Sequence, residues 1–330
     1  MYLDVTMPLA LFLVTVLATL LNEKIEGKLK MVFEERKFRV QDAILLVAAM
    51  GITVSVIVFV PQMAVMGVFL FAYSMLLFIF TYLFSNMEKD KAKVFFAAFS
   101  LISFAIASIS LFSFGAEAPV AYGALVFFCL CGFSFLALLY EQCGAQSKER
   151  WYMAVFPPVT FVSLYLFFGK TPIWFPYLLN LYGMIFAVLV IIYLASLFTW
   201  KTSLIFVGLL TAMDIILVLV TGSMVSAATH VSGLRLPVMV SLPTFPTARL
   251  DAPYISLGLG DFFFAGLLAT QTFKKFGKNF AVLSAVAMTA SFFFFEMAIL
   301  NYGLKAFPGT LMIICGWLPL VVWKKIMIKL

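Results

Sequence analysis

Three carboxylates of this sequence lie inside apolar stretches long enough to be surrounded by lipid: Asp214, Asp261 and Glu296. An ionised side chain at bilayer depth costs at least ~2.5 kcal/mol, so each of these residues indicates a functional site until another role is found. Asp261 ends the motif Gly258-Leu-Gly-Asp261, which stands in the apolar run 254–273. The motif therefore places a carboxylate where lipid is expected.

The two glycines of this motif suggest how a second acid could be reached. Residues without side chains let another helix backbone approach closely. We expect Gly258 and Gly260 to lie on the face that meets the helix of Asp214. A bulky replacement at Gly260 should then impair the chemistry while leaving Asp261 itself unchanged.

Two aspartates that face one another in a water-filled, low-dielectric pocket cannot both ionise comfortably, so they share a proton. One can take a proton from water while the other gives one to a peptide carbonyl oxygen, as in aspartic proteases. A transporter that relays protons or binds ions also places acids near the middle of the membrane. The chemistry of Asp214 and Asp261 leaves both functions open. For Glu296 we favour a structural or water-facing role.

Other catalytic chemistries are less compatible with this sequence. A metalloprotease of the HExxH type needs two histidines four residues apart, and the chain has one histidine, His230. A serine mechanism needs a nucleophile paired with a histidine from another element, and no G-x-S-x-G occurs. There is no glycine-rich phosphate loop or nucleotide motif either. We expect neither a metal nor a cofactor.

The composition is that of a polytopic membrane protein built from helices. The chain has 330 residues, of which 64% are hydrophobic and 11% are charged. A soluble domain is nearer ~45 to 50% apolar and ~25% charged. The net charge of +7 does not indicate a nucleic-acid partner, because its distribution along the chain is a topology signal. We expect a multi-pass protein of the cell membrane, with the lipid bilayer as its surroundings.

Apolar runs of roughly 17 to 25 residues predict transmembrane helices. Eleven such runs occur, at about 6–21, 42–60, 62–85, 94–114, 119–140, 152–169, 177–199, 202–222, 255–273, 279–303 and 308–323. When the connections are assigned alternately to the two sides, all but four of the 22 Lys and Arg fall on one side; the four are Lys170, Arg235, Arg249 and Lys305. The positive-inside rule then places the N-terminus outside and the C-terminus in the cytoplasm.

The acids divide the chain into two functional regions. No acidic residue lies deep within a span before residue 199, so we interpret 1–199 as a helical scaffold and 200–330 as the catalytic region. The longest connection, 223–254, lies on the predicted outer side. Within it, Leu236–Pro243 is predicted to be a short extended segment, either an edge strand or a half-inserted stretch. Asp251 is a candidate N-cap for a helix that starts with Pro253.

The motif Gly258-Leu-Gly-Asp261, one span after an aspartate in mid-helix, resembles the presenilin and signal peptide peptidase family of intramembrane aspartyl proteases, and in particular its archaeal homologues. The connection Gly222–Pro243 is similar to the one between the catalytic helices of those homologues, and the resemblance covers about residues 202–323. It implies a presenilin-like helical bundle, with Asp214 and Asp261 as the catalytic pair. The substrates would be membrane proteins or remnant signal peptides.

The chain departs from the family pattern in three places. Met213 stands where the family usually has a tyrosine, and Phe307-Pro-Gly-Thr-Leu311 replaces its Pro-Ala-Leu motif. Seven spans rather than five precede Asp214, which adds two N-terminal helices to the nine of the family. A catalytically inert family member is therefore a third alternative. The residues to which the resemblance gives a role in binding or positioning substrate are Gly258, Leu259, Gly260, Pro308, Gly309, Leu311 and Met213.

A substrate helix must unwind before its amide can be attacked, and an unwound backbone in a membrane needs new hydrogen-bond partners. Our hypothesis is that Leu236–Leu242 and the backbone around Pro308 supply these partners by strand addition. The scissile bond would then lie between Asp214 and Asp261.

Overall fold

The computed structural model describes residues 2–32, 37–83, 89–112, 118–140, 151–247, 254–304 and 306–329. The chain divides into two compact units, one of Met1–Val65 with Leu179–Leu330 and one of Met66–Leu178. These boundaries differ from the predicted functional division at residue 200. That division was based on the positions of the acidic residues and not on which parts of the chain pack together, and it stays a prediction. Asp214, Asp261 and Glu296 all belong to the first unit.

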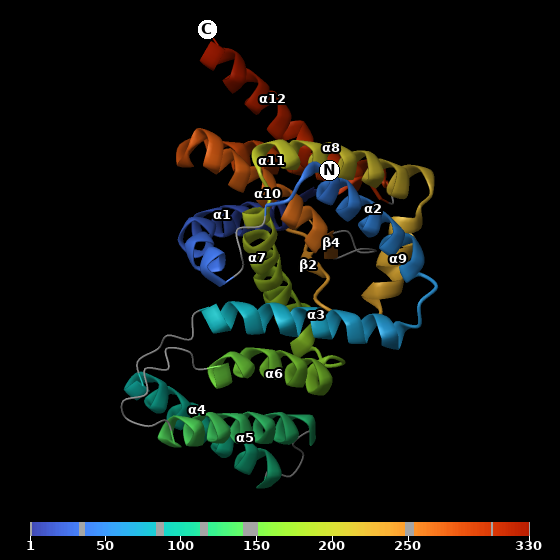
Figure 1. The fold of residues 1–330 in the computed structure, drawn as a ribbon. Coiled ribbons are helices and arrows are strands. Elements are labelled where there is room, and N and C mark those ends of the chain that lie inside the picture. Colours follow the sequence, from blue (N-terminus) through green and yellow to red (C-terminus); the bar gives the residue numbers. More distant parts are fainter. Residues whose placement is uncertain are drawn as a thin grey trace. The chain divides into compact units, whose positions relative to one another are not determined.

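Every one of the eleven apolar runs coincides with a helix among the described residues (Figure 1), and the connection after the eighth run contains a further short helix. Two helices are continuous with π-helical segments, η1 before α7 and η2 after α8. The helices are α1 Thr6–Val32, α2 Val40–Ile57, α3 Gln62–Leu83, α4 Lys89–Phe112, α5 Ala118–Tyr140, α6 Trp151–Phe168, η1 Ile173–Leu178, α7 Leu179–Leu197, α8 Trp200–Ile215, η2 Ile216–Val220, α9 Ser223–Ser232, α10 Leu259–Phe276, α11 Lys278–Tyr302 and α12 Gly309–Lys329.

Eight of the described helices are long and apolar enough to cross a membrane. They contain α1, α2, α3, α5, α7 with η1, α8 with η2, α11 and α12. The chain is thus an all-α polytopic membrane protein, as the composition predicted. The crossing of α4, α6 and α10 stays a prediction, and so do the number of eleven crossings and the orientation of the termini.

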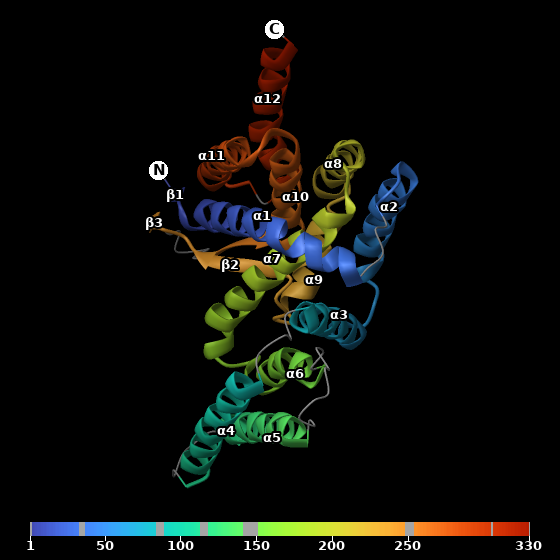
Figure 2. The ribbon, with the colours of Figure 1, turned by 60° about the vertical axis from the view of Figure 1, so that its left-hand side comes forward.

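Helix α10 is the central element of the first unit. Its residues from Phe262 to Thr272 are buried without interruption, as expected for a helix that is surrounded on all sides. It contacts α1, α7, α8, α11 and α12, and Figure 2 shows it between α11 and α8. A methyl group added at Gly266 would lie 2.5 Å from the side chain of Ile191 on α7. The absence of a side chain at Gly266 therefore lets α7 and α10 pack closely.

Polar side chains also connect α10 to its neighbours within this core. The indole N–H of Trp317 on α12 donates a hydrogen bond of 2.9 Å to Oγ1 of Thr272. The amide of Gln271 donates to the carbonyl oxygens of Ala195 and Phe198, at 3.2 and 3.1 Å, where α7 ends. Because these groups are buried, each needs such a partner to avoid a desolvation cost. The contacts hold α12 and α7 in register with α10.

Two short antiparallel strand pairs lie in the first unit. Strand β2, Met239–Pro243, pairs with β4, Tyr254–Gly258, and strand β1, Leu3–Asp4, pairs with β3, Pro246–Thr247. The extended segment predicted at Leu236–Pro243 is confirmed for Met239–Pro243, which form β2, whereas residues 236–238 precede the strand, the last two of them in a turn. The helix predicted to start near residue 254 is wrong in its first turn, because Tyr254–Gly258 is a strand and α10 begins at Leu259. The predicted N-cap Asp251 lies outside the described residues.

The second unit contains most of α3 and all of α4, α5, α6 and η1, and it has an apolar core between α4, α5 and α6. Ala92, Phe96, Cys131, Leu138 and Met153 are buried together there. The ring of Phe156 on α6 makes edge-to-face contacts with Phe96 and Phe127, at centroid distances of 5.9 and 5.8 Å. Aromatic packing of this kind joins the three helices. None of the three acids singled out in the sequence belongs to this unit.

Candidate active site

Asp214 lies in the last turn of α8, one residue before the helix widens into η2, and its side chain is buried. One oxygen of its carboxyl group, Oδ2, accepts two hydrogen bonds from Thr310 on α12. The hydroxyl of Thr310 donates at 2.6 Å and its backbone N–H donates at 3.2 Å. A residue 96 positions further along the chain therefore holds this carboxyl group in place.

Asp261 lies in the first turn of α10 and is half-buried. Gly258, the N-cap of the helix, makes a backbone hydrogen bond to its carboxylate. A carboxylate in the first turn of a helix is stabilised by the N–H groups that the turn leaves unpaired. The motif Gly258-Leu-Gly-Asp261 thus begins the helix, whereas the sequence had placed it inside one.

The first residues of α12 meet both carboxyl groups. A methyl group added at Gly309 would overlap the carboxyl of Asp261, and the next residue, Thr310, binds Asp214. Pro308 is buried just before the helix, and its carbonyl oxygen accepts the N–H of Met312 at 3.3 Å. The N-terminus of a helix attracts negative charge. The two carboxyl groups are also close enough for the charge of Asp214 to act on Asp261.

The predicted role of Gly258 and Gly260 in helix packing is wrong. Gly260 is exposed, and a methyl group added there would meet nothing within 4 Å. A methyl group at Gly258 would be at an ordinary contact distance, 3.5 Å, from Oδ2 of Asp261. The close approach that the chemistry needs occurs at Gly309, because the start of α12 lies against Asp261 and the helix of Asp214 does not lie against Gly260.

The remaining predicted positioning residues have different surroundings. The backbone N–H of Leu259 donates to the carbonyl of Val238 at 3.0 Å and so extends the β2–β4 ladder. Met213 packs toward α2, because its sulfur would lie 2.7 Å from a methyl group added at Gly51. Leu311 is half-buried in the first turn of α12. The sequence prediction placed Pro308 and Gly309 beside the acids but gave no role to Thr310. The position of Thr310, directly after a Pro-Gly pair that starts a helix, was the feature of the sequence that could have identified it.

Glu296 lies elsewhere in the same unit, on α11, and is 4% exposed. Neither of its oxygens has a hydrogen-bond partner among the described residues. The charge that acts on it comes from Asp4 of β1. Asp4 accepts hydrogen bonds from the N–H groups of Thr6, Met7 and Phe245 and from the hydroxyl of Thr6. Glu296 therefore belongs to the region where the N-terminal strand meets α11.

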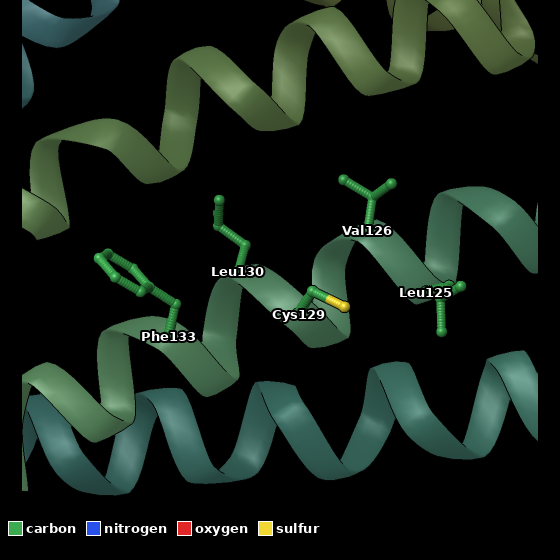
Figure 3. Close-up of a pocket in the computed structure, with 5 residues that line it drawn as sticks. All are labelled: Leu125, Val126, Cys129, Leu130 and Phe133. Atoms are coloured by element: carbon green, nitrogen blue, oxygen red, sulfur yellow. The ribbon is translucent and has the colours of Figure 1, made fainter.

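The second unit offers an apolar groove instead of a polar site. The groove, of about 350 Å³, is lined by one face of α5 (Figure 3), at Leu125, Val126, Cys129, Leu130 and Phe133. Among the described residues, those that line this groove include no carboxylate, histidine or lysine. An aliphatic and aromatic face of this kind on an apolar helix is suited to lipid tails or to another helix.

The structure therefore brings the carboxyl groups of Asp214 and Asp261 together at the start of α12. Such a site can share a proton and activate a water molecule. Comparisons of this chain with protein-family models, with curated proteins and with solved structures found no match.

Proposed function

We propose that this chain is an intramembrane aspartyl protease of the presenilin and signal peptide peptidase type, which hydrolyses peptide bonds within transmembrane segments of the cell membrane. The observation that carries the proposal is the meeting of both carboxyl groups at the start of α12, through Gly309 and Thr310. The resemblance gives Phe307–Leu311 the place of the family's Pro-Ala-Leu motif, at the start of the last helix. In the proposed reaction water is the second substrate, and no cofactor takes part.

The hydrogen bonds support a different role for each acid. Thr310 directs two donors at Asp214, whereas Asp261 has one backbone donor among the described residues, Gly258, and donors stabilise the charged form of a carboxyl group. Asp214 is then the base that takes a proton from water as the water oxygen attacks the peptide carbonyl carbon. Asp261 is the acid that gives its proton to the carbonyl oxygen. When the C–N bond breaks, the proton on Asp214 passes to the leaving nitrogen, and Asp261 recovers a proton from the hydroxyl groups of the intermediate.

The β2–β4 pair indicates where an unwound substrate would find hydrogen-bond partners. The outer edge of β2 is already used, because the side chain of Asn180 on α7 binds both the N–H and the carbonyl oxygen of Ser241, at 2.7 and 2.6 Å. Ser241 is opposite Ser256 in the ladder. A residue that bonds outward in an antiparallel pair has a partner that also faces outward. The N–H and carbonyl of Ser256 are therefore directed away from β2.

This geometry changes the hypothesis drawn from the sequence. Strand addition on Leu236–Leu242 would have to displace Asn180, whereas β4 presents its outer edge at the exposed residue Ser256. Strand β4 runs directly into Gly258 and Asp261. A substrate strand paired with β4 would thus reach the carboxyl groups within a few residues. We propose β4 as the strand that receives the substrate.

The decisive experiment is cleavage of a helical membrane substrate in detergent or lipid by the wild type, Asp214→Asn and Asp261→Asn. Both variants should lose cleavage while keeping the thermal unfolding midpoint of the wild type. Residual cleavage by either variant would exclude the paired mechanism. Proton-coupled solute flux without cleavage would favour the transporter, and the absence of both activities would favour an inert member of the family.

A second experiment tests the substrate strand. Ser256→Pro removes the outward N–H and keeps the backbone bonds between β4 and β2, and proline is tolerated at a strand edge. The side-chain hydrogen bond of 2.7 Å between Ser256 and Ser241 is lost equally in Ser256→Pro and Ser256→Ala. We expect Ser256→Pro to lower the cleavage rate about tenfold, since a backbone hydrogen bond contributes roughly 0.5 to 1.5 kcal/mol. Ser256→Ala keeps the N–H and is the matched control. Equal rates for the two variants would contradict pairing at β4.

A further inference from the structure

A polar pocket of about 370 Å³ lies at the lysine-rich end of the first unit, far along the helices from the start of α12. It is formed where α7 ends, where α8 begins at Trp200 and where α10 ends at Lys274 and Lys275. Lys37, which precedes α2, completes it. The sequence predicts this end of the bundle to be cytoplasmic, and nothing in the proposed protease mechanism uses it.

The described residues that line the pocket carry an excess of positive charge. Glu26 is the one acid among its described lining residues, and it is already paired with Lys274 at 2.9 Å. Within the described part of the chain, Lys37 and Lys275 form no ion pair. Lys275 in addition experiences the like charge of Lys325. Two unneutralised ammonium groups on one pocket are a site for an anion.

Trp200 joins these charges to the three helices that carry the candidate active site. The ammonium groups of Lys275 and Lys325 lie 4.2 and 5.9 Å from the centre of its indole ring. The same ring contacts Phe276 of α10 and Trp317 of α12, at centroid distances of 5.5 and 6.0 Å. Tryptophan prefers the headgroup region of a membrane, so the position of Trp200 is that of a residue beside lipid phosphates.

We propose that this pocket binds the phosphate group of an anionic phospholipid, held by Lys37 and Lys275 and bordered by the indole of Trp200. The bound phosphate neutralises the two unpaired lysines and relieves the repulsion between Lys275 and Lys325. Because Lys275 ends α10 and Lys325 lies on α12, the lipid stabilises the contact of α8, α10 and α12. The inference stands independently of the protease.

The test uses the delipidated full-length protein in a neutral detergent, to which a short-chain phosphatidylglycerol is added. The thermal unfolding midpoint should rise with the lipid concentration, and phosphatidylcholine at the same concentrations should have little effect. Lys275→Gln and Lys37→Gln should each raise the half-saturating concentration about tenfold, the change expected when one charged contact to phosphate is lost. Lys201→Gln, which removes a lysine beside Trp200 that does not line the pocket, is the matched control and should leave binding unchanged.

A variant that is expected to strengthen lipid binding makes the test more stringent. Glu26→Gln frees Lys274 from its ion pair and should lower the half-saturating concentration. The pocket would be excluded if Lys275→Gln and Glu26→Gln bound phosphatidylglycerol like the wild type, or if Lys201→Gln weakened binding as much as Lys275→Gln. Inorganic phosphate and glycerol phosphate are tested in the same way as phosphatidylglycerol. If they stabilise the protein as strongly as the lipid does, and if Lys275→Gln weakens their binding equally, the ligand is a free phosphate and the proposed lipid is wrong.

Discussion

Among the described residues, Thr310 alone donates the two hydrogen bonds that the carboxyl group of Asp214 accepts. Thr310→Val removes the hydroxyl donor at 2.6 Å but keeps the shape and the backbone N–H. A hydrogen bond to a charged group contributes roughly 1.5 to 3 kcal/mol, so we predict a loss of cleavage rate of roughly tenfold to a hundredfold. Thr310→Ser keeps the hydroxyl and should stay near the wild type. The measurement is the turnover of one membrane substrate, and equal turnover of the two variants would remove Thr310 from the site.

Gly309 is the second residue on which the site depends. Its missing side chain provides the space that the carboxyl of Asp261 occupies. Gly309→Ala should displace that carboxyl and lower cleavage about 100-fold, since a misplacement of about 1 Å can have this effect. Gly260→Ala adds the same methyl group where nothing lies within 4 Å, and should retain activity. Assays of the two variants under identical conditions would refute this assignment if Gly260→Ala were the more damaged.

At the scale of elements, the close packing of α11 and α12 depends on Gly316. A methyl group there would overlap the carbonyl oxygen of Ala287 and lie 2.8 Å from Cβ of Ser291. Ser291 also donates a hydrogen bond of 2.7 Å to the carbonyl of Met312, so the two backbones cannot separate freely. Gly316→Ala should lower stability by roughly 1 to 3 kcal/mol, the usual cost of overpacking.

The matched control for this prediction is Gly208→Ala on α8, where an added methyl group meets nothing. Thermal unfolding in one detergent measures both variants. A midpoint for Gly316→Ala within one degree or so of the Gly208→Ala value would show that α11 and α12 do not need the small residue. Alanine is a better helix former than glycine, so Gly208→Ala should be neutral or slightly stabilising.

The helices could be predicted from local sequence patterns, whereas one strand depends on a partner that is distant in the sequence. The helix ranges followed from apolar runs, because a backbone in lipid must satisfy its own hydrogen bonds and a helix does so locally. The same reasoning placed Tyr254–Gly258 in a helix, and there it was wrong. That segment satisfies its backbone by pairing with Met239–Pro243, a partner that apolar periodicity does not reveal.

At the scale of the whole molecule, the N-terminal strand closes the first unit against α11. The amide of Asn301 donates to the carbonyl of Tyr2 at 2.8 Å, and the N–H of Tyr2 donates back at 2.9 Å. Asp4 meanwhile accepts the N–H of Phe245, beside β3. The strand thus connects the segment that contains β2, β3 and β4 to the helix that carries Glu296.

Glu296 is the buried carboxyl group at this junction. It is 4% exposed, and neither of its oxygens has a hydrogen-bond partner among the described residues. A buried polar group without a partner lowers stability. We predict that Glu296→Met, which keeps the length of the side chain and removes its polar oxygens, raises the thermal unfolding midpoint. A midpoint equal to or below that of the wild type would contradict this prediction.

What the sequence by itself determined is the membrane class, the approximate range of each helix and the identity of the buried acids, because these follow from composition and from patterns within one element. Only the tertiary structure decided which glycine makes room for Asp261 and which residue binds Asp214. Gly309 and Thr310 replace Gly260 in that role because packing sets which helix faces meet. The hydrogen bond from Thr310 to Asp214 joins residues 96 positions apart, and no local pattern encodes such a contact.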